Sequence, residues 1–388
     1  MAATSIGCLA APPSSTAAPD ADGGVGAGLI MNGVGGRDGI TLDSRDELVL
    51  AGVRDAGGNP TPIAVILEGG DGGLAAITGR VADLPFLPIA GTVVRWTDEY
   101  GVFVALGPAG DLIAIDIAGR VTPIEVVGDA AGLPFEHVAE IGAASRHLLL
   151  TAGARMFATE ALDDTIPGAA LDSTLVGQSA SDIVFVAGYD GNPNAIGEVE
   201  DGGQLSVFLF DSASTTIGED LVADAITPPL GEARWTVWDS FWMHLVALGP
   251  SPGQVFWHRT PLDTGVPALT AIDLDEPALR DVDVTSVDGD GLDVIFLVER
   301  GEEVAVQIYL DPIAGESAVF TNPIEVPVPL AAAEPGPWLH AMDAVDDGGV
   351  PGINEIIVHD RDGRAVCVDY DEGAVGLCGE VDLAAFLD

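Results

Sequence analysis

The most distinctive acidic stretch of the chain, residues 283–298, reads DVTSVDGDGLDVIFLV. Asp288 and Asp290 alternate with glycines, and Asp293 begins a run of apolar residues. Calcium takes about six to eight oxygen ligands, and alternating carboxylates on a tight glycine-containing turn can supply them. The stretch therefore predicts a structural calcium site at Asp288, Asp290 and Asp293, with Asp283 as a substitute ligand from upstream. The competing interpretation is an acidic turn whose carboxylates are solvated.

A second acidic segment has the same ingredients with an insertion. Asp343, Asp346 and Asp347 come before a glycine-rich stretch and then before the apolar run that begins at Glu355. It is a second candidate for calcium, for the same chemical reason.

Short apolar runs recur along the chain and must position these acidic segments. They cover residues 47–53, 101–107, 147–153, 182–188, 244–249, 293–298 and 355–359. A turn and a second, partly alternating strand follow most of them, which is typical of antiparallel sheet. A spacing of about 50 residues is that of propeller blades. We expect an all-β fold, a single β-propeller of four-stranded blades over residues 29–388. Seven blades fit best, six or eight are the alternatives, and the apolar runs are expected to be the innermost strands.

The segment from Ser286 to Ile295 resembles the FG-GAP and VCBS repeat family, which includes the propeller of integrin α subunits. Asp288, Asp290 and Asp293 match the later acidic positions of that family's loop, whereas Ser286 stands where the first aspartate belongs and one residue before Asp293 is missing. The resemblance implies a propeller fold and calcium held in loops that precede apolar strands.

Charge limits the partners of this protein. The formal net charge is -47, from 61 acidic against 14 basic residues, and lysine is absent. Such a field repels nucleic acid and anionic membranes, so we expect no nucleic-acid partner.

With 48% hydrophobic residues the chain can bury a large core. No apolar run reaches the roughly 20 residues of a membrane span. We expect a monomer.

The cysteines and the N-terminal segment bear on the compartment. Residues 1–28 are rich in Ala, Pro, Ser and Gly and predict a flexible tether. Cys8 follows a small residue, as in a lipoprotein signal, which favours an extracellular or cell-envelope location with a lipid anchor. Cys367 and Cys378 would lie opposite each other in a hairpin, where a disulfide and two buried thiols are both open.

Two functions follow from features of the sequence, and a purely structural role in the cell envelope is a third alternative. No nucleophile elbow, phosphate loop or HExxH zinc motif is present. The first function is therefore non-catalytic binding of a protein or carbohydrate on one propeller face, with Trp235, Trp238 and Trp242 as a platform unless they pack in the core. The alternative is a propeller enzyme, a hydrolase or lyase, with a site in the central channel. Arginine and histidine residues that border the apolar runs would form that site: Arg146, His147, His244, His340 and His359. Convergence of these side chains favours the enzyme, and scatter favours binding.

Overall fold

The computed structural model shows an all-β protein. It describes residues 27–33, 47–55, 60–68, 78–97, 100–116, 118–141, 146–162, 168–189, 194–225, 233–238, 242–249, 251–261, 268–274, 278–285, 287, 293–314, 317–332, 336–342, 355–360, 362–371 and 374–382. These residues contain thirty strands and no α-helix. Within them, no helix is long and apolar enough to cross a membrane.

The strands form seven antiparallel units of four, called blades 1 to 7 in chain order. Blade 1 contains β1 (Ala27–Gly33), β2 (Glu47–Asp55), β3 (Pro60–Glu68) and β4 (Thr78–Asp83). Blade 2 contains β5 (Ala90–Thr97), β6 (Tyr100–Leu106), β7 (Leu112–Asp116) and β8 (Val121–Gly128). Blade 3 contains β9 (His137–Ile141), β10 (His147–Ala152), β11 (Arg155–Thr159) and β12 (Ala170–Gln178). Blade 4 contains β13 (Ile183–Tyr189), β14 (Asn194–Glu200), β15 (Gln204–Asp211) and β16 (Thr216–Ala225).

The remaining blades follow the same plan. Blade 5 contains β17 (Ala233–Trp238), β18 (Trp242–Leu248), β19 (Gln254–Pro261) and β20 (Ala268–Asp273). Blade 6 contains β21 (Leu279–Thr285), β22 (Asp293–Arg300), β23 (Glu303–Tyr309) and β26 (Ile324–Ala331). The small hairpin of β24 (Ile313–Ala314) and β25 (Ser317–Ala318) is inserted before β26. Blade 7 contains β27 (Trp338–Met342), β28 (Glu355–His359), β29 (Arg364–Asp371) and β30 (Ala374–Asp382).

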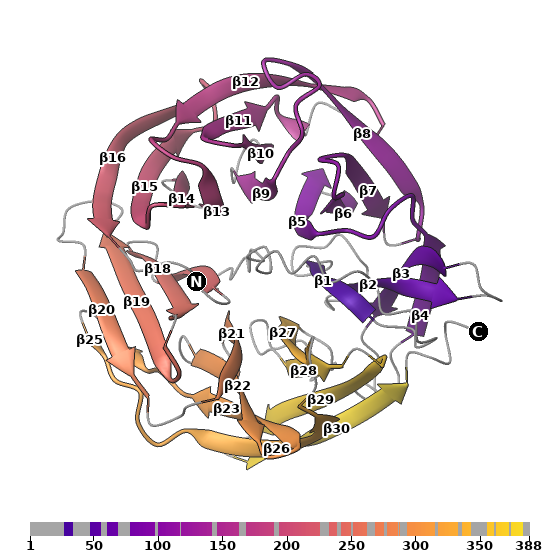
Figure 1. Cartoon of the computed structure of the whole chain (residues 1–388), viewed down its shortest axis with the longest axis vertical. Coiled ribbons are helices and arrows are strands. Elements are labelled where there is room, and N and C mark those ends of the chain that lie inside the picture. The colour runs from indigo at the N-terminus through magenta and orange to yellow at the C-terminus, as the bar shows by residue number, and fades with distance from the viewer. Residues whose placement is uncertain are drawn as a thin grey trace.

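The blades stand around a common centre and close into a propeller, as the sequence predicts (Figure 1). A buried apolar cluster fills each interface between neighbouring blades. Leu50 and Leu67 of blade 1 pack with Ile357 and Ala365 of blade 7, so apolar packing joins the first blade to the last. Each of these two blades is built from one continuous part of the chain, and burial of apolar surface therefore holds the ring shut.

Blades 2 and 3 also share one sheet. Their outermost strands, β8 and β12, pair in parallel from Glu125 with Ala170 to Gly128 with Ser173. The Ser173 hydroxyl donates to the Val127 carbonyl and accepts from the amide of Ala130 at 3.0 Å. This pairing makes one eight-stranded sheet of the two blades.

One expectation about strand order is wrong. Six of the seven apolar runs form the second strand of their blade, and only residues 182–188 fall in a first strand, β13. The second strand is bonded on both edges and packed between blades on both faces, whereas the first strand borders the centre of the ring (Figure 1). Uniform apolar sequence therefore marks the most enclosed strand, which is the second one.

At the N-terminus, β1 begins at Ala27, so residues 27 and 28 belong to a strand and not to the expected tether.

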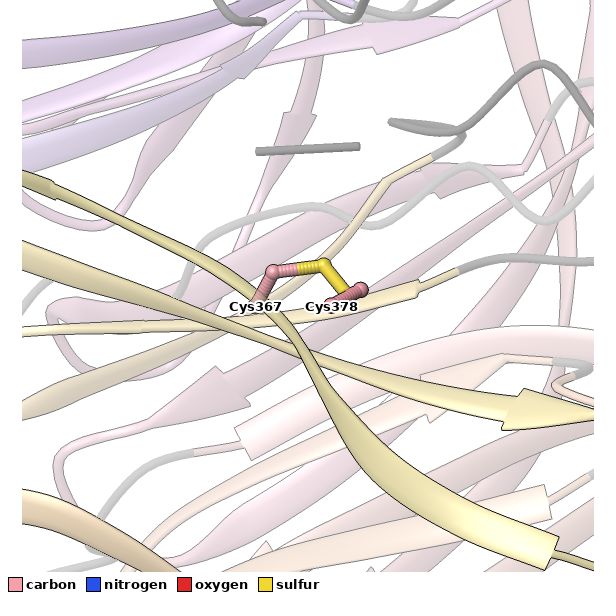
Figure 2. Close-up of a disulfide and its surroundings, with 2 residues drawn as sticks. All are labelled: Cys367 and Cys378. Carbon is pink, nitrogen blue, oxygen red and sulfur yellow. A yellow bond between two sulfur atoms is a disulfide. The ribbon is translucent and has the colours of Figure 1, made fainter. Parts of the chain in front are cut away.

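A disulfide joins Cys367 of β29 to Cys378 of β30 (Figure 2). The two Cα atoms are 5.1 Å apart. The hairpin is irregular between Cys367 and Val368, and Cys367 pairs with Gly379, so Cys378 is not its direct partner. Cys367 is fully buried in the cluster that joins blades 7 and 1, and Cys378 packs against that cluster. The bond thus fastens the last strand of the chain beside the ring closure.

Candidate functional site

The first and the last carboxylate of the predicted calcium stretch, Asp283 and Asp293, have structural contacts in blade 6. Asp293 begins β22 with 0% of its surface exposed. One of its carboxylate oxygens accepts from the amide of Val287 at 2.8 Å, and the other from the amide of Asp311 at 3.0 Å. Asp283 is buried in β21 and accepts from the next amide, that of Val284, at 2.8 Å. Asp293 therefore ties the loop before β22 to the turn after β23.

Asp288, Asp290, Asp343, Asp346 and Asp347 lie outside the described residues. Within the described part of the chain, no group of three or more His, Cys, Asp or Glu side chains is arranged to hold a metal ion. Calcium in the loop before β22 stays a prediction.

The histidines of blade 7 are packed in the core. His340 of β27 and His359 of β28 are 1% and 0% exposed, and their ring centroids are 5.8 Å apart. His359 also stacks on Trp338, with centroids 4.9 Å apart. Burial lowers the pKa of His359 to about 3, so this ring is neutral at physiological pH. The pair is an aromatic stack within one blade.

His244 of blade 5 has a similar environment. The indole N–H of Trp257 donates to its Nδ1 at 3.2 Å, and the two rings stack. Burial, followed by the nearby charges of Arg259 and His258, lowers the pKa of His244 to about 3. A ring with so low a pKa is a weak base at neutral pH, which makes general base catalysis by His244 inefficient.

Blade 3 holds the remaining residues proposed for a channel site. His147 donates from Nδ1 to the carbonyl of Thr159 at 2.7 Å. Arg146 lies 4.0 Å from the carboxylate of Glu140, and both side chains are buried. The ring of His147 also meets the ring of Phe210 in blade 4 edge-on, with centroids 5.6 Å apart. These histidines and arginines are therefore buried in core contacts on three different blades, 3, 5 and 7. The side chains of Trp235, Trp238 and Trp242 lie outside what the structure describes.

The structure does show a cleft that sequence reasoning missed, between blades 3 and 4. Its volume is about 270 Å³. Blade 3 contributes Met156, Gly177 and Gln178, the connection to blade 4 contributes Ser179 and Ala180, and blade 4 contributes Glu198, Glu200, Gln204, Ser206, Phe208 and Ile217. The cleft therefore combines hydroxyl, amide, carboxylate and apolar groups.

Two carboxylates of β14 lie in this cleft, each held by the connection between the blades. Glu198 is 1% exposed and accepts from the Ser179 hydroxyl at 2.7 Å. Glu200 is 7% exposed, and one of its oxygens accepts from both the amide and the hydroxyl of Ser181, at 3.0 and 2.7 Å. Its other oxygen accepts from the amide of Ala180 at 3.3 Å. These bonds fix the carboxylates with respect to residues 179–181.

β14 differs from the second strands of the other blades. Those strands contain the aliphatic runs of the sequence, and two of them, β22 and β28, begin with one buried acid each, Asp293 and Glu355. β14 instead reads NAIGEVE and has two carboxylates at buried positions. Burying a carboxylate costs free energy unless it is paired, so acids within such a strand suggest a role beyond packing. The alternation of Glu198 and Glu200 is the only sequence signal. It is weak in a chain with 61 acidic residues, and Ser179 approaches only through the tertiary fold.

Comparisons with known proteins identify no family for this chain. No protein-family model matches it, and no curated protein matches it. Among solved structures, the crystal structure of BBS1N in complex with ARL6DN, soaked with lead, is similar to it. The sequence identity is 12%, the TM-score is 0.45, and the match covers 74% of this chain and 80% of that one.

Proposed function

We propose that this chain is a non-catalytic propeller that binds a protein or carbohydrate partner on one of its faces, outside the cell or at the cell envelope. The observation that carries the proposal is the burial of the candidate histidines and arginines of blades 3, 5 and 7 in core contacts, where their rings pack against aromatic neighbours. A catalytic channel needs such groups to converge on one substrate. Rigid blades that present loops at the two ends of the ring suit binding instead.

The test is a binding screen that also reads chemical change. Immobilised full-length protein is presented to a displayed peptide library and to a glycan array, and each retained ligand is analysed by mass spectrometry after release. We expect one peptide consensus or one glycan class to bind saturably and to be recovered unchanged. Recovery of a cleaved or eliminated product would instead establish the propeller enzyme. Absence of saturable binding in both libraries would contradict the binding function.

We also propose that the loop before β22 holds a structural calcium ion, in the manner of FG-GAP and VCBS repeats. Support comes from the aspartate pattern and from the position of this loop directly before an apolar strand, β22. Thermal unfolding is measured after chelation, and then with calcium or magnesium at millimolar concentration. We expect a calcium-selective rise in melting temperature that is lost in Asp288→Asn/Asp290→Asn.

Asp293→Asn separates the two roles of this loop. Because Asp293 accepts two backbone hydrogen bonds, its replacement should lower stability by about 1–3 kcal/mol even in chelator. Equal stabilisation by both cations in the wild type would contradict the calcium proposal, whereas the chelator result for Asp293→Asn tests only the hydrogen bonds.

The location is a proposal that the disulfide supports, because such bonds persist in oxidising compartments. Alkylation of the protein directly in lysing source cells, before any air oxidation, should leave Cys367 and Cys378 unmodified. Labelling of both would argue for a reducing compartment. The proposed lipid anchor at Cys8, which lies outside the described residues, would appear as a diacylglycerol adduct on the N-terminal peptide.

A further inference from the structure

We propose that the cleft between blades 3 and 4 binds a positively charged nitrogen on a hydrocarbon stem, as in the lysine or arginine side chain of a partner protein. The proposal rests on the binding function above, because it names where one group of the partner is held and which chemistry recognises it. The shared chemistry also fits a free alkylamine, and the experiment distinguishes the two sources.

The charge of the cleft selects a cation. Glu198 and Glu200 both lie in it, and none of the described residues that line it is basic. Both carboxylates are more than nine-tenths buried, so water screens their interaction with a bound charge less than at the surface. An ammonium or guanidinium group can form charge-assisted hydrogen bonds with such acceptors, which are stronger than neutral ones. An anion would be repelled here.

The other walls suit the stem and the size of such a ligand. Met156, Phe208 and Ile217 supply apolar surface, and Ser206 and Gln204 supply polar groups near the carboxylates. Pockets for drug-sized ligands measure about 300–1,000 Å³. At about 270 Å³, this cleft is suited to a single side chain or a small amine.

The position of the acids gives an independent reason. In the other six blades the second strand is filled mainly with aliphatic residues, which stabilise the ring by burial. Blade 4 keeps the strand but replaces part of that packing with Glu198 and Glu200. Hydrogen bonds from Ser179, Ala180 and Ser181 offset part of the cost of burying these charges, and a cation brought by a ligand would offset more of it.

Binding is tested on the full chain by titration calorimetry with pentylamine, with 1-pentanol as its neutral isostere. We expect saturable binding of pentylamine and no binding of pentanol. Glu198→Gln and Glu200→Gln should each weaken pentylamine binding about tenfold or more. Glu125→Gln, which removes one exposed carboxylate from β8, is the matched control and should bind as the wild type does. Equal affinity in all four proteins, or equal binding of pentanol, would overturn the proposal.

A second variant protects the test from loss of folding in Glu198→Gln. Ala180 is exposed at the cleft, so Ala180→Arg should fold normally and place its own guanidinium between the carboxylates. We expect it to abolish pentylamine binding while the melting temperature is kept. Unchanged pentylamine binding in this variant would overturn the assignment. Calcium that binds with the same dependence on Glu198 and displaces pentylamine would also overturn it, in favour of a metal site.

Two further arms identify the source and separate this inference from the proposed function. A Gly-Gly-Lys-Gly-Gly peptide that binds more tightly than pentylamine, with loss of binding on lysine acetylation, supports a protein side chain. Tighter binding of free pentylamine would overturn the proposal that the amine belongs to a partner protein.

If a partner selected in the library screen binds Glu198→Gln and Ala180→Arg as it binds the wild type, the cleft assignment fails while the binding function stands. If pentylamine binds as expected but no library ligand is retained, the binding function fails and the amine site stands.

Discussion

At the scale of single residues, buried polar side chains connect strands and blades in this protein. Asp281 of β21 accepts from the amide of Leu339 at 2.8 Å and so links blade 6 to blade 7. His137 of blade 3 donates from Nε2 to the carbonyl of Ile183 in blade 4 at 3.0 Å. Such bonds satisfy groups that would otherwise be costly to bury, and they fix how adjacent blades meet.

The buried His359 leads to a prediction about acid stability. Its pKa falls from an ordinary 6.5 to about 3 in the folded protein, because burial disfavours the charged ring. Below pH 6.5 the unfolded chain binds the proton first, so stability is full above that pH and is lost as the pH falls toward 3. His359→Phe keeps a ring on Trp338 and removes the proton site. Between pH 6 and pH 4 we expect its unfolding free energy to fall less steeply than that of the wild type, by about 1.4 kcal/mol per pH unit.

Urea unfolding at several pH values measures this slope. Ile357→Val, at a fully buried and non-ionisable neighbour on the same strand, is the control. It should lower the unfolding free energy by about 1 kcal/mol at every pH. A wild-type slope in His359→Phe would show that this histidine does not contribute to acid unfolding.

At the scale of elements, the parallel pair of β8 and β12 depends on a glycine at its end. Gly128 has φ +78°, and a Cβ there would lie 2.3 Å from a carboxylate oxygen of Asp172 and 2.5 Å from the carbonyl oxygen of Ser173. Gly132 has φ +70°, and a Cβ added there would meet no other atom within 4 Å. The two glycines share the left-handed conformation and differ in the space around them.

Alanine at these two glycines should therefore have unequal effects. Gly132→Ala carries only the cost of the left-handed conformation, about 1–2 kcal/mol. Gly128→Ala must also displace the backbone of Ser173, so we expect a loss of about 3 kcal/mol or more. Chemical denaturation of both variants measures the difference. Equal losses would mean that β8 and β12 separate at this point without cost.

The disulfide of blade 7 should stabilise the ring at its closure. The bridged cysteines are 11 residues apart, and closing a loop of this length in the unfolded chain is worth roughly 3 kcal/mol. We expect Cys378→Ser to lower the unfolding free energy by about that amount, and Cys8→Ser to leave it unchanged. Protein produced without the lipid should show one reactive thiol, that of Cys8, and protein lipidated at Cys8 should show none. Three reactive thiols, or equal stability of the two variants, would contradict this role.

At the scale of the whole molecule, the net charge of -47 acts against the compact state. The distance over which charges interact shrinks from about 10 Å at 0.1 M salt to about 3 Å at 1 M. We therefore expect the melting temperature to rise by several degrees with sodium chloride, mostly below about 0.3 M, where screening changes fastest. Calorimetry across a salt series measures this. A rise that continues linearly to high salt would indicate a general salting-out effect instead.

The same charge bears on recognition. A cation approaching this surface is attracted from a distance at low ionic strength, before it reaches any particular site. The cleft between blades 3 and 4 would then add specificity through Glu198 and Glu200. Affinity for a basic partner should depend on salt, whereas the difference between wild type and Glu198→Gln should depend on it less, because that carboxylate is buried.

The sequence by itself determined the architecture, because the pattern that predicts a blade is local and recurs along the chain. Aliphatic runs about 50 residues apart, each with a turn and a second strand, predict four-stranded blades, and the described residues form seven of them. The separation of Cys367 and Cys378 around a short turn allowed the disulfide that the structure contains. The position of the apolar runs within the blades does not follow from the sequence, and six of the seven runs form second strands rather than innermost ones. A sequence shows that a run is enclosed but not which neighbours enclose it.

Only the tertiary structure decided which distant side chains meet. The parallel pairing of β8 with β12 and the approach of Ser179 to Glu198 join segments whose partners no local pattern specifies. The same holds for the histidines, whose spacing allowed a channel site and whose rings are packed in the core against Phe210, Trp257 and Trp338. Blade packing sets these contacts, and packing energy depends on the whole ring rather than on any one stretch of sequence.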